Sequence, residues 1–451
     1  MAERGDYLIR DGAIVSVDPT IGDLARGSVL VRDGVIVDVG ESVDVVHDRD
    51  AEVIDASAML VMPGLIDSHH HMWSALGRNF LSEGFEYYPA KWATSAAYEP
   101  VDFYNSILLG LVECVRAGIT TVHNWSHNTR TPAHADAELS AHRVGLVRAR
   151  YSYGHRDLQP DEEALEFTDI DRVATTWFGA DRPLEGLVHL GVNLRGPDAG
   201  LEPVFHREMD AARSRSLPVS IHASQGPTTR ISGPDFDARG YLGPSMLLCH
   251  YLPATAEDRA AMARTATPLS WAMHSELRLG EAGDPRTALL AMVDAGVDVS
   301  LSTDATSLGP VDLFAAMHVA WSLGIPWAQT DSADFAALTF RQCIEMATIN
   351  GARALGLGDV TGSITPGKRA DLILIRRHDV NVAPVVDLEA TIVRSVTPAN
   401  VDTVLVDGRV LKRGGDLVAV DVEEVVRNAE TSALAVRTRA GGRLAPRREM
   451  P

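Results

Sequence analysis

Cysteine is scarce in this chain: Cys114, Cys249 and Cys343 are the only three among 451 residues. An odd, widely spaced set does not suit a disulfide framework and is typical of a reducing compartment, so we expect a cytoplasmic protein. No apolar run approaches the roughly 18 residues of a membrane-spanning helix. The first residues also lack the apolar core of a secretory signal. We therefore expect neither secretion nor membrane insertion.

Basic residues are also in short supply, with 41 Lys and Arg against 61 Asp and Glu and a formal net charge of −20. A surface this acidic repels phosphate groups, so we expect no nucleic-acid partner and no membrane partner. Apolar residues make up 45% and charged residues 23%, which is ordinary globular usage and excludes a disordered or collagen-like chain. The length allows two to four domains, or one large barrel with an appendage.

The two ends of the chain share a β-rich pattern. Residues 7–12, 28–34 and 35–40 are short β-rich runs, and Asp-Gly pairs at 11–12 and 33–34 predict hairpin turns. Residues 370–375 and 401–410 repeat the pattern near the other end. These runs predict one small β-sandwich domain that is split between residues 1–60 and 361–420. Residues 421–451 are predicted to form a C-terminal helix and a flexible tail.

Residues 61–360 alternate short apolar runs with longer helical stretches. Examples are the runs 119–123, 188–194, 219–222, 246–250 and 299–303, which stand between helical stretches such as 101–117, 202–215, 256–264 and 285–295. Regular alternation predicts an α/β protein with a parallel sheet. About eight units in roughly 300 residues suit a TIM-like (β/α)₈ barrel. An open doubly wound sheet is the rival, but no glycine-rich phosphate motif follows a strand to support it.

Three adjacent histidines follow a strongly apolar run near the start of this region. Alternate residues of a strand face the same side, so His69 and His71 can both point at one ion while His70 points away. Imidazole nitrogen is a common ligand for zinc and iron. The alternative is a solvated turn rich in histidine.

Other polar residues also stand where apolar runs stop. His222, His250 and Asp304 each end such a run. Taken singly, either histidine could be structural and the aspartate could cap the next helix. In a parallel barrel, however, the carboxyl ends of the strands meet in one mouth, where active sites lie. Together with His69 and His71, the set favours a metal site.

Two stretches of this sequence resemble the amidohydrolase superfamily. Residues 63–71, PGLIDSHHH, resemble the PGL-[IV]-[DN]-x-HxH strand of the branch that holds cytosine, guanine and S-adenosylhomocysteine deaminases and triazine chlorohydrolases. Residues 348–357 and 362–372, TINGARALGL and GSITPGKRADL, resemble the C-terminal signature of that branch. The resemblance covers nearly the whole chain, including the split β domain around a barrel.

The resemblance implies a site with one divalent metal ion, most commonly zinc and sometimes iron. Its ligands would be His69, His71, His222 and Asp304, with Asp304 also a catalytic proton carrier and His250 orienting the water or the substrate. Asn193 ends the fourth barrel strand where a binuclear site would have a carbamylated lysine. The implied enzyme is a hydrolase in which a metal-bound hydroxide attacks an sp² carbon and cleaves a C–N bond of a nitrogen heterocycle. Homo-oligomers, dimers or tetramers, are common in the branch.

This sequence also departs from the branch. The usual HxxE of the fifth strand, whose glutamate protonates the ring, is here His222-Ala223-Ser224-Gln225. Glutamine can donate and accept hydrogen bonds but cannot supply a proton at neutral pH. Residues 270–280 are unusual in carrying His274 and Glu276, and either could replace the missing acid or bind substrate. The alternative for Glu276 is a simple pair with Arg278.

The departure at Gln225 keeps a second class of function open. An enzyme of the same fold could perform non-hydrolytic chemistry as a cyclase, dehydratase or decarboxylase. A third class, a binding protein without activity, is disfavoured because the predicted ligand set is intact.

Aromatic residues cluster near the predicted mouth. We expect a small-molecule substrate, a flat nitrogen-rich ring, because aromatic faces stack and their polar tips donate hydrogen bonds. The alternative is packing beneath long loops. The predicted substrate-binding residues are Trp73, Trp92, Trp125, Tyr153 and Asn193.

Overall fold

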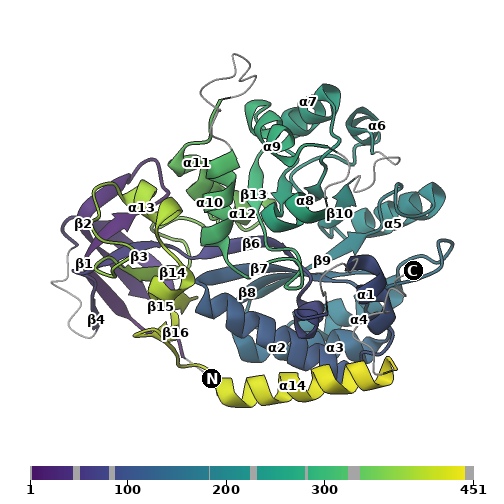
Figure 1. The fold of residues 1–451 in the computed structure, drawn as a ribbon, viewed down its shortest axis with the longest axis horizontal. Helices are drawn as coiled ribbons and strands as arrows, with labels where there is room; N and C mark the ends of the chain where they lie inside the picture. The colour runs from purple at the N-terminus through teal and green to yellow at the C-terminus, as the bar shows by residue number, and fades with distance from the viewer. Residues whose placement is uncertain are drawn as a thin grey trace, which may run out of the picture.

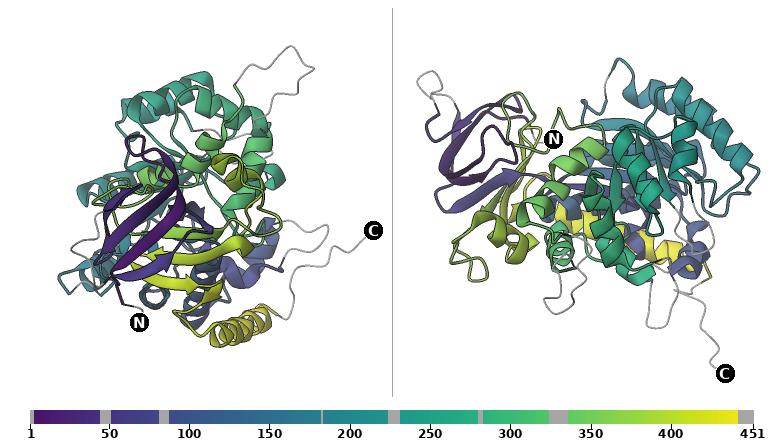
Figure 2. Two further views of the ribbon diagram at one scale, coloured as in Figure 1. Left: turned by 90° about the vertical axis from the view of Figure 1, so that its left-hand side faces the viewer. Right: turned by 90° about the horizontal axis from the view of Figure 1, so that it is seen from above.

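The computed structural model describes residues 3–43, 51–80, 87–181, 183–223, 231–279, 283–323 and 336–441. A barrel and a separate β-sheet lie side by side (Figure 1), and the two further views in Figure 2 show the same arrangement. Gln225 lies outside the described residues, and so does the predicted tail beyond residue 441.

Eight parallel strands form the barrel, and in the described part of the chain each pairs with its neighbours in sequence order. This order confirms the predicted (β/α)₈ barrel. The strands are β6 (Leu65–His70), β7 (Ile119–Ser126), β8 (Arg148–Tyr153), β9 (Val188–Leu194), β10 (Val219–Ala223), β11 (Met246–His250), β12 (Leu269–Trp271) and β13 (Val299–Leu301).

The barrel closes between its first and last strands through residues that the sequence analysis selected. The backbone N–H of Asp304 donates to the carbonyl of His69 at 2.9 Å, and that of His71 donates to the carbonyl of Asp304 at 2.7 Å. Asp304 and His70 thereby form an isolated parallel bridge just beyond β13. The hydrogen bonds that complete the barrel therefore also fix the backbone of the predicted metal ligands.

Helices surround the barrel strands and follow most of them in the chain. The last helix, α14, packs along the outside next to α2 (Figure 1). No helix within the described ranges is both long and apolar enough to cross a membrane. The helices are η1 (Met72–Gly77), α1 (Tyr87–Ser95), α2 (Pro100–Arg116), α3 (Pro132–Gly145), α4 (Phe167–Phe178), α5 (Glu202–Ser214), α6 (Gly233–Ala238), α7 (Ala256–Thr265), α8 (Met273–Leu279), α9 (Pro285–Asp294), α10 (Leu313–Leu323), α11 (Phe340–Met346), α12 (Ile349–Ala354), α13 (Leu388–Arg394), η2 (Pro398–Asn400) and α14 (Val422–Arg439).

The separate sheet takes strands from both ends of the chain, as predicted. Its strands are hydrogen-bonded in the order β17-β16-β15-β14-β5-β1-β2-β3, with β4 paired to β1. They are β1 (Tyr7–Val15), β2 (Asp23–Arg32), β3 (Val35–Gly40), β4 (Glu52–Asp55), β5 (Met59–Pro63), β14 (Leu372–Arg376), β15 (Val401–Val406), β16 (Arg409–Arg413) and β17 (Asp416–Leu417).

Strand β14 shows how this sheet serves two cores. Leu372 and Leu374 belong to a small core within the sheet domain, whereas Ile373 and Ile375 belong to the large core that continues into the barrel. Alternate residues of a strand face opposite sides, so one continuous apolar run fills both cores. The sheet is thereby packed directly against the barrel.

The two predicted Asp-Gly turns have different outcomes. Asp33 and Gly34 do connect β2 to β3, with φ angles of 43° and 73° that suit a tight hairpin. The predicted turn at 11–12 is wrong, because β1 continues through it. Asp11 has a φ of 66°, and the pairing of β1 with β2 shifts register around Gly12. A left-handed conformation makes a hairpin turn at Asp33 and Gly34, whereas at Asp11 it produces a β-bulge within β1.

A glycine and a buried ion pair join the barrel to the sheet. Gly64 lies between β5 and β6, and a Cβ there would overlap the Thr120 side chain, so the chain needs glycine to enter the barrel. The Arg148 guanidinium donates to both carboxylate oxygens of Asp371, at 2.6 and 3.1 Å. Asp371 belongs to the C-terminal sequence signature, which therefore has a structural role at this junction.

Candidate metal centre and active site

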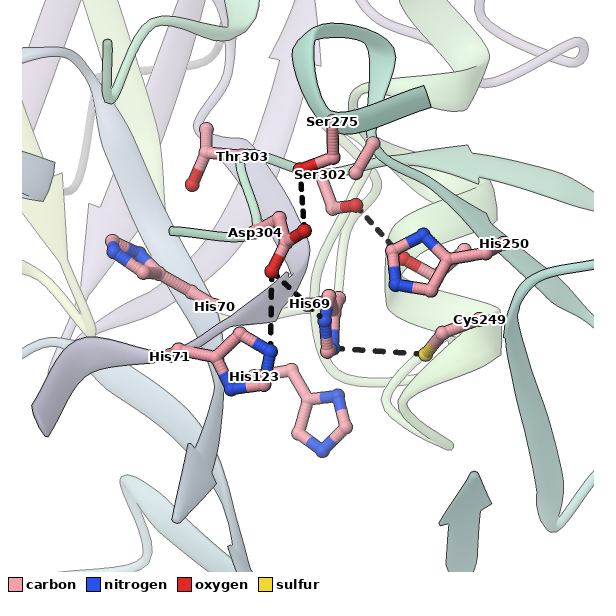
Figure 3. Close-up of polar contacts among 12 residues, drawn as sticks. His69, His70, His71, His123, Cys249, His250, Ser275, Ser302, Thr303 and Asp304 are labelled. Atoms are coloured by element: carbon pink, nitrogen blue, oxygen red, sulfur yellow. Dashed lines mark hydrogen bonds and ion pairs between the residues drawn. The ribbon is translucent and has the colours of Figure 1, made fainter. Parts of the chain in front are cut away.

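The predicted metal ligands converge at the carboxyl ends of β6, β10 and β11 and just after β13. His69, His71 and His222 each offer a nitrogen within 4.8 Å of the others, and His69, His250 and Asp304 do the same. Figure 3 shows the side chains of His69, His71, His250 and Asp304 directed toward one another. The structure therefore brings all five residues into one cluster.

Asp304 is the centre of the polar contacts in this cluster. Its Oδ1 lies 3.4 Å from His69 Nε2 and 3.1 Å from His71 Nε2. Its Oδ2 accepts a short hydrogen bond from the Ser275 hydroxyl. The Asp304 backbone has a φ of 60°, a left-handed conformation that is uncommon for aspartate and typical of residues held for function. The carboxylate is therefore fixed from both sides.

The ring of His222 is held between neighbouring rings. It stacks on His250 with ring centroids 5.3 Å apart and an interplanar angle of 7°. Trp125 lies on it with centroids 4.3 Å apart, and His71 lies 5.3 Å away. This packing restricts rotation of the imidazole and keeps its nitrogen at the cluster.

The donor set fits a divalent cation. Burial lowers the pKa of His69, His71 and His222, so their imidazoles are neutral and have a lone pair to share. Burial alone would raise the pKa of Asp304, but its close contacts with the rings of His69 and His71 lower that pKa well below its usual range. Nε2 of His69 and Nε2 of His250 are buried with no hydrogen-bond partner among the described residues. Such orphaned nitrogens need a ligand to compensate their burial.

His70 points away from the cluster, as the strand alternation predicts (Figure 3). Its Nδ1 lies 3.3 Å from the Asp67 carboxylate, which also accepts the backbone N–H of Thr303 at 3.1 Å. His70 therefore belongs to the packing between the first and last strands of the barrel.

Glu276 is paired with a histidine of the cluster. His250 Nδ1 lies 2.7 Å from Glu276 Oε1, and both side chains are buried. Within the described part of the chain this is the ion pair of Glu276, in place of the pair with Arg278 considered from sequence. Burial opposes protonation of His250, but the Glu276 carboxylate outweighs it and raises the pKa of His250. His274 is not part of this pair; burial lowers the pKa of His274, and the charge of Asp312 offsets this only in part.

A cavity of about 1280 Å³ opens over the cluster. Trp92, Trp125 and Asn193 line it, together with Glu276. Trp73, Tyr153 and His274 are not among the described residues that line it, and Trp73 and Tyr153 are instead buried behind the wall. The Trp73 indole donates to His127 at 3.0 Å, and the Tyr153 hydroxyl donates to Asp169 at 2.9 Å. Trp73 therefore contacts a residue of the cavity wall, whereas Asp169 is not among the described residues that line the cavity.

Lys91, His127 and Asp157 also line the cavity and are not among the predicted site residues, although the sequence places His127 near the mouth at the end of the second barrel strand. His127 Nδ1 lies 2.9 Å from His71 Nδ1. Lys91 Nζ lies 3.0 Å from the Asp157 carboxylate, and His127 Nε2 lies 3.5 Å from it. His127 could have been found from its place two residues after Trp125 at the end of β7. Lys91 and Asp157 come from separate segments, and no spacing in the sequence connects them.

A parallel barrel whose strand ends gather histidines and an aspartate around one point defines a class, the metal-dependent barrel hydrolases. The comparison with protein families agrees, because the model of the amidohydrolase family matches residues 60–411. The chain belongs to the amidohydrolase family. It is therefore a hydrolytic enzyme, and the family and the histidine-rich donor set together support a divalent metal as its cofactor.

Curated relatives cover most of the chain. The sequence is 27% identical to a 5'-deoxyadenosine deaminase of Methanosarcina mazei over 95% of this chain and 98% of the relative. It is 29% identical to a 5-methylthioadenosine/S-adenosylhomocysteine deaminase of Moorella thermoacetica over 83% of this chain and 86% of the relative.

Solved structures share the fold. An adenosine deaminase of Xanthomonas campestris with bound zinc has a TM-score of 0.83 at 22% identity, covering 97% of this chain and all of the other. An atrazine chlorohydrolase of Arthrobacter aurescens complexed with zinc has a TM-score of 0.79 at 19% identity, covering 95% of this chain and all of the other. The proteins named here are hydrolytic, so the non-hydrolytic alternative gains no support.

Proposed function

We propose that this protein is a zinc-dependent deaminase that replaces an exocyclic amino group of a nitrogen heterocycle by oxygen from water and releases ammonia. The observation that carries the proposal is the convergence of His69, His71, His222 and Asp304 beneath an aromatic-lined cavity. The named relatives are deaminases of adenine nucleosides, and the named structures hold zinc. A cavity of about 1280 Å³ has room for a nucleoside-sized molecule.

The four ligands would hold one ion, which when bound supplies the Lewis acidity that lowers the pKa of water toward neutrality. Asp304 then has a second task, since its carboxylate is placed to take a proton from water and return it to the departing amino nitrogen. The Ser275 hydroxyl donates to Oδ2 and thereby leaves Oδ1 facing the histidines. The hydrogen bond from Ser275 therefore leaves Oδ1 of Asp304 as the oxygen that takes up and returns the proton.

His250 and Glu276 supply the second polar arm of the site. Glu276 accepts from Nδ1 of His250, so Nε2 is directed into the cluster, where it can steady the attacking water or the reacting carbon. Gln225 cannot protonate a ring nitrogen. We assign that task to the His250–Glu276 pair, because this titratable pair lies beside the predicted ligands and both of its residues line the cavity.

The proposal extends to the cellular setting. All three cysteines are buried free thiols, which is consistent with a reducing compartment and with our proposal of a cytoplasmic enzyme. A homo-oligomer, a dimer or a tetramer, stays part of this proposal.

Ammonia release by the zinc-loaded protein tests the proposal. We would screen adenosine, 5'-deoxyadenosine, adenine and guanine, together with aminopyrimidines, aminotriazines and pterins. Turnover of any ring, with one zinc per chain, is the expected result.

Asp304→Asn should lower kcat by at least roughly 10²-fold, because it removes the proton carrier. Asp294→Asn, an exposed aspartate of α9, is the matched control. One zinc per chain without ammonia from any ring would overturn deamination and direct the search to amides and lactams.

A further inference from the structure

A second histidine stands directly behind the metal ligand His71. His127 follows β7, and its Nδ1 lies 2.9 Å from His71 Nδ1, the nitrogen of His71 that faces away from Asp304. The same His127 nitrogen lies 3.0 Å from the indole Nε1 of Trp73. Two groups therefore meet at one imidazole nitrogen, and their chemistry determines where the protons are.

The indole of Trp73 settles the tautomer of His127. An indole N–H can only donate, so Nδ1 of His127 must be the unprotonated, accepting nitrogen. His71 Nδ1 then has to donate to it as well, which places the proton of His71 on Nδ1. The lone pair of His71 is therefore on Nε2, the nitrogen that lies 3.1 Å from Asp304 and faces the predicted metal position.

The outer end of this network has an equally definite arrangement. With Nδ1 unprotonated, the His127 proton is on Nε2, which lies 3.5 Å from Asp157 Oδ1. The Lys91 ammonium lies 3.0 Å from the same oxygen and 3.2 Å from His127 Nε2. Both nitrogens carry protons, so the approach of Lys91 to His127 is not a hydrogen bond. Both donors point at Asp157, and its negative charge offsets the unfavourable contact between the two N–H groups.

We propose that His127 is the positioning residue of the metal ligand His71, and that Asp157 keeps His127 in the tautomer this task requires. His127 accepts the Nδ1–H of His71 and so directs the Nε2 lone pair of His71 at the ion. A metal-bound histidine usually donates its other N–H to an outer partner, and loss of that partner typically costs 10- to 100-fold in metal affinity. The inference rests on the proposed function only in needing a metal at His71.

Asp157 matters because of Lys91. Without the carboxylate, the ammonium would favour the opposite tautomer, in which Nε2 of His127 accepts from Lys91. Nδ1–H of His127 would then face the N–H groups of Trp73 and His71, three donors without an acceptor. Such an arrangement is unstable when buried. His71 would have to rotate or move its proton to Nε2, and in either case it would bind the ion less well.

The test compares zinc affinity, measured by competition with a chromogenic chelator, and the absorption spectrum of the Co²⁺-substituted protein. His127→Leu removes the acceptor and should weaken zinc binding by roughly 10- to 100-fold and change the Co²⁺ spectrum. His127→Asn keeps a carbonyl oxygen near the place of Nδ1 and should retain most of the affinity. His206→Leu is the matched control, because this histidine of α5 contacts Glu202 and Tyr241 and is not part of the cluster.

A second pair of variants tests the tautomer itself. Asp157→Ala should weaken zinc binding, and adding Lys91→Met should restore much of it, because the cation that forces the wrong tautomer is then gone. A double variant that binds zinc no better than Asp157→Ala contradicts the role of Asp157.

The outcomes separate this inference from the proposed function. If the wild-type protein does not bind one zinc per chain, the proposed function fails and the inference fails with it. If the wild type binds zinc and His127→Leu does so equally well with an unchanged Co²⁺ spectrum, only the inference is overturned. A fall in the melting temperature of metal-free His127→Leu with wild-type zinc affinity would show a structural role alone and would also overturn it.

Discussion

His250 and Glu276 form a buried pair in which Nδ1 and Oε1 are 2.7 Å apart, at the edge of the predicted metal site. Glu276 comes from α8 and His250 from the end of β11, so the pair links two neighbouring barrel units. Glu276 does not approach the predicted ligands through any contact found among the described residues. Its influence on the site must therefore pass through His250 or through a bound substrate.

Glu276→Gln tests this influence directly. Glutamine keeps an oxygen that can accept from His250 but removes the negative charge that favours a protonated imidazole. We expect kcat to fall by roughly 10- to 100-fold while zinc content is unchanged. Steady-state ammonia release and metal analysis measure the two effects. Glu202→Gln, an exposed glutamate of α5, serves as the control. A kcat equal to that of the wild type would remove the pair from the mechanism.

Gln225→Glu addresses the departure from the deaminase branch. A glutamate here would supply a titratable proton for a ring nitrogen, and general acid catalysis contributes typically 10²- to 10⁴-fold. We expect at least about tenfold higher kcat/KM on aminopyrimidines, which need ring protonation. Gln342→Glu in the capping box of α11, where either residue can cap, controls for the added charge. If turnover is unchanged, ring protonation by the His250–Glu276 pair does not limit the rate, which agrees with the role that we propose for this pair.

The strands were predictable from sequence where apolar runs stand alone between helices. The predicted runs 188–194 and 246–250 coincide with β9 and β11. The convergence of the candidate metal ligands was predictable for the same reason, because His69 and His71 share one face of a strand and the other candidates end runs of their own. Of the segment that carries His274 and Glu276, the sequence analysis predicted no secondary structure; β12 ends at Trp271 and α8 begins at Met273. A short strand followed at once by a helix gives no clear periodicity.

The outer contacts of the site could not be predicted in this way. Lys91 lies on α1, His127 follows β7 and Asp157 follows β8, so three separate segments meet around one carboxylate. Neither strand alternation nor helical spacing relates residues that meet only in the folded barrel. The pairing of Glu276 with His250 was hidden for the same reason.

A buried glutamate on α3 predicts how stability depends on pH. Glu138 accepts from the Ser126 hydroxyl at 2.6 Å and from the Asn124 amide at 2.8 Å, and burial raises the pKa of Glu138 to about 8. The folded protein therefore keeps a proton that the unfolded chain releases near its ordinary pKa of about 4.3. The free energy of unfolding should fall as pH rises between these two values, by up to about 1.4 kcal/mol per pH unit from this group.

Glu138→Gln should remove this contribution. Urea denaturation at several pH values between 5 and 8 would show a flatter dependence for the variant than for the wild type, while the exposed Glu202→Gln variant follows the wild type. Parallel curves for wild type and Glu138→Gln would show that Glu138 is ionised in the folded protein.

The junction between barrel and sheet makes a prediction about stability alone. Arg148 is 2% exposed and donates to both oxygens of Asp371, and it lies 3.5 Å from Asp407. Arg148→Met would leave two buried carboxylates without this cation, and breaking a buried pair in this way costs about 3–5 kcal/mol. Arg215→Met removes the exposed pair with Asp171 and should cost no more than about 1 kcal/mol.

Urea denaturation compares the free energy of unfolding of the two variants. Zinc content per folded chain should be unchanged in both, because neither arginine reaches the metal site. Equal stability of the two variants would show that the junction depends on packing rather than on the Arg148–Asp371 pair.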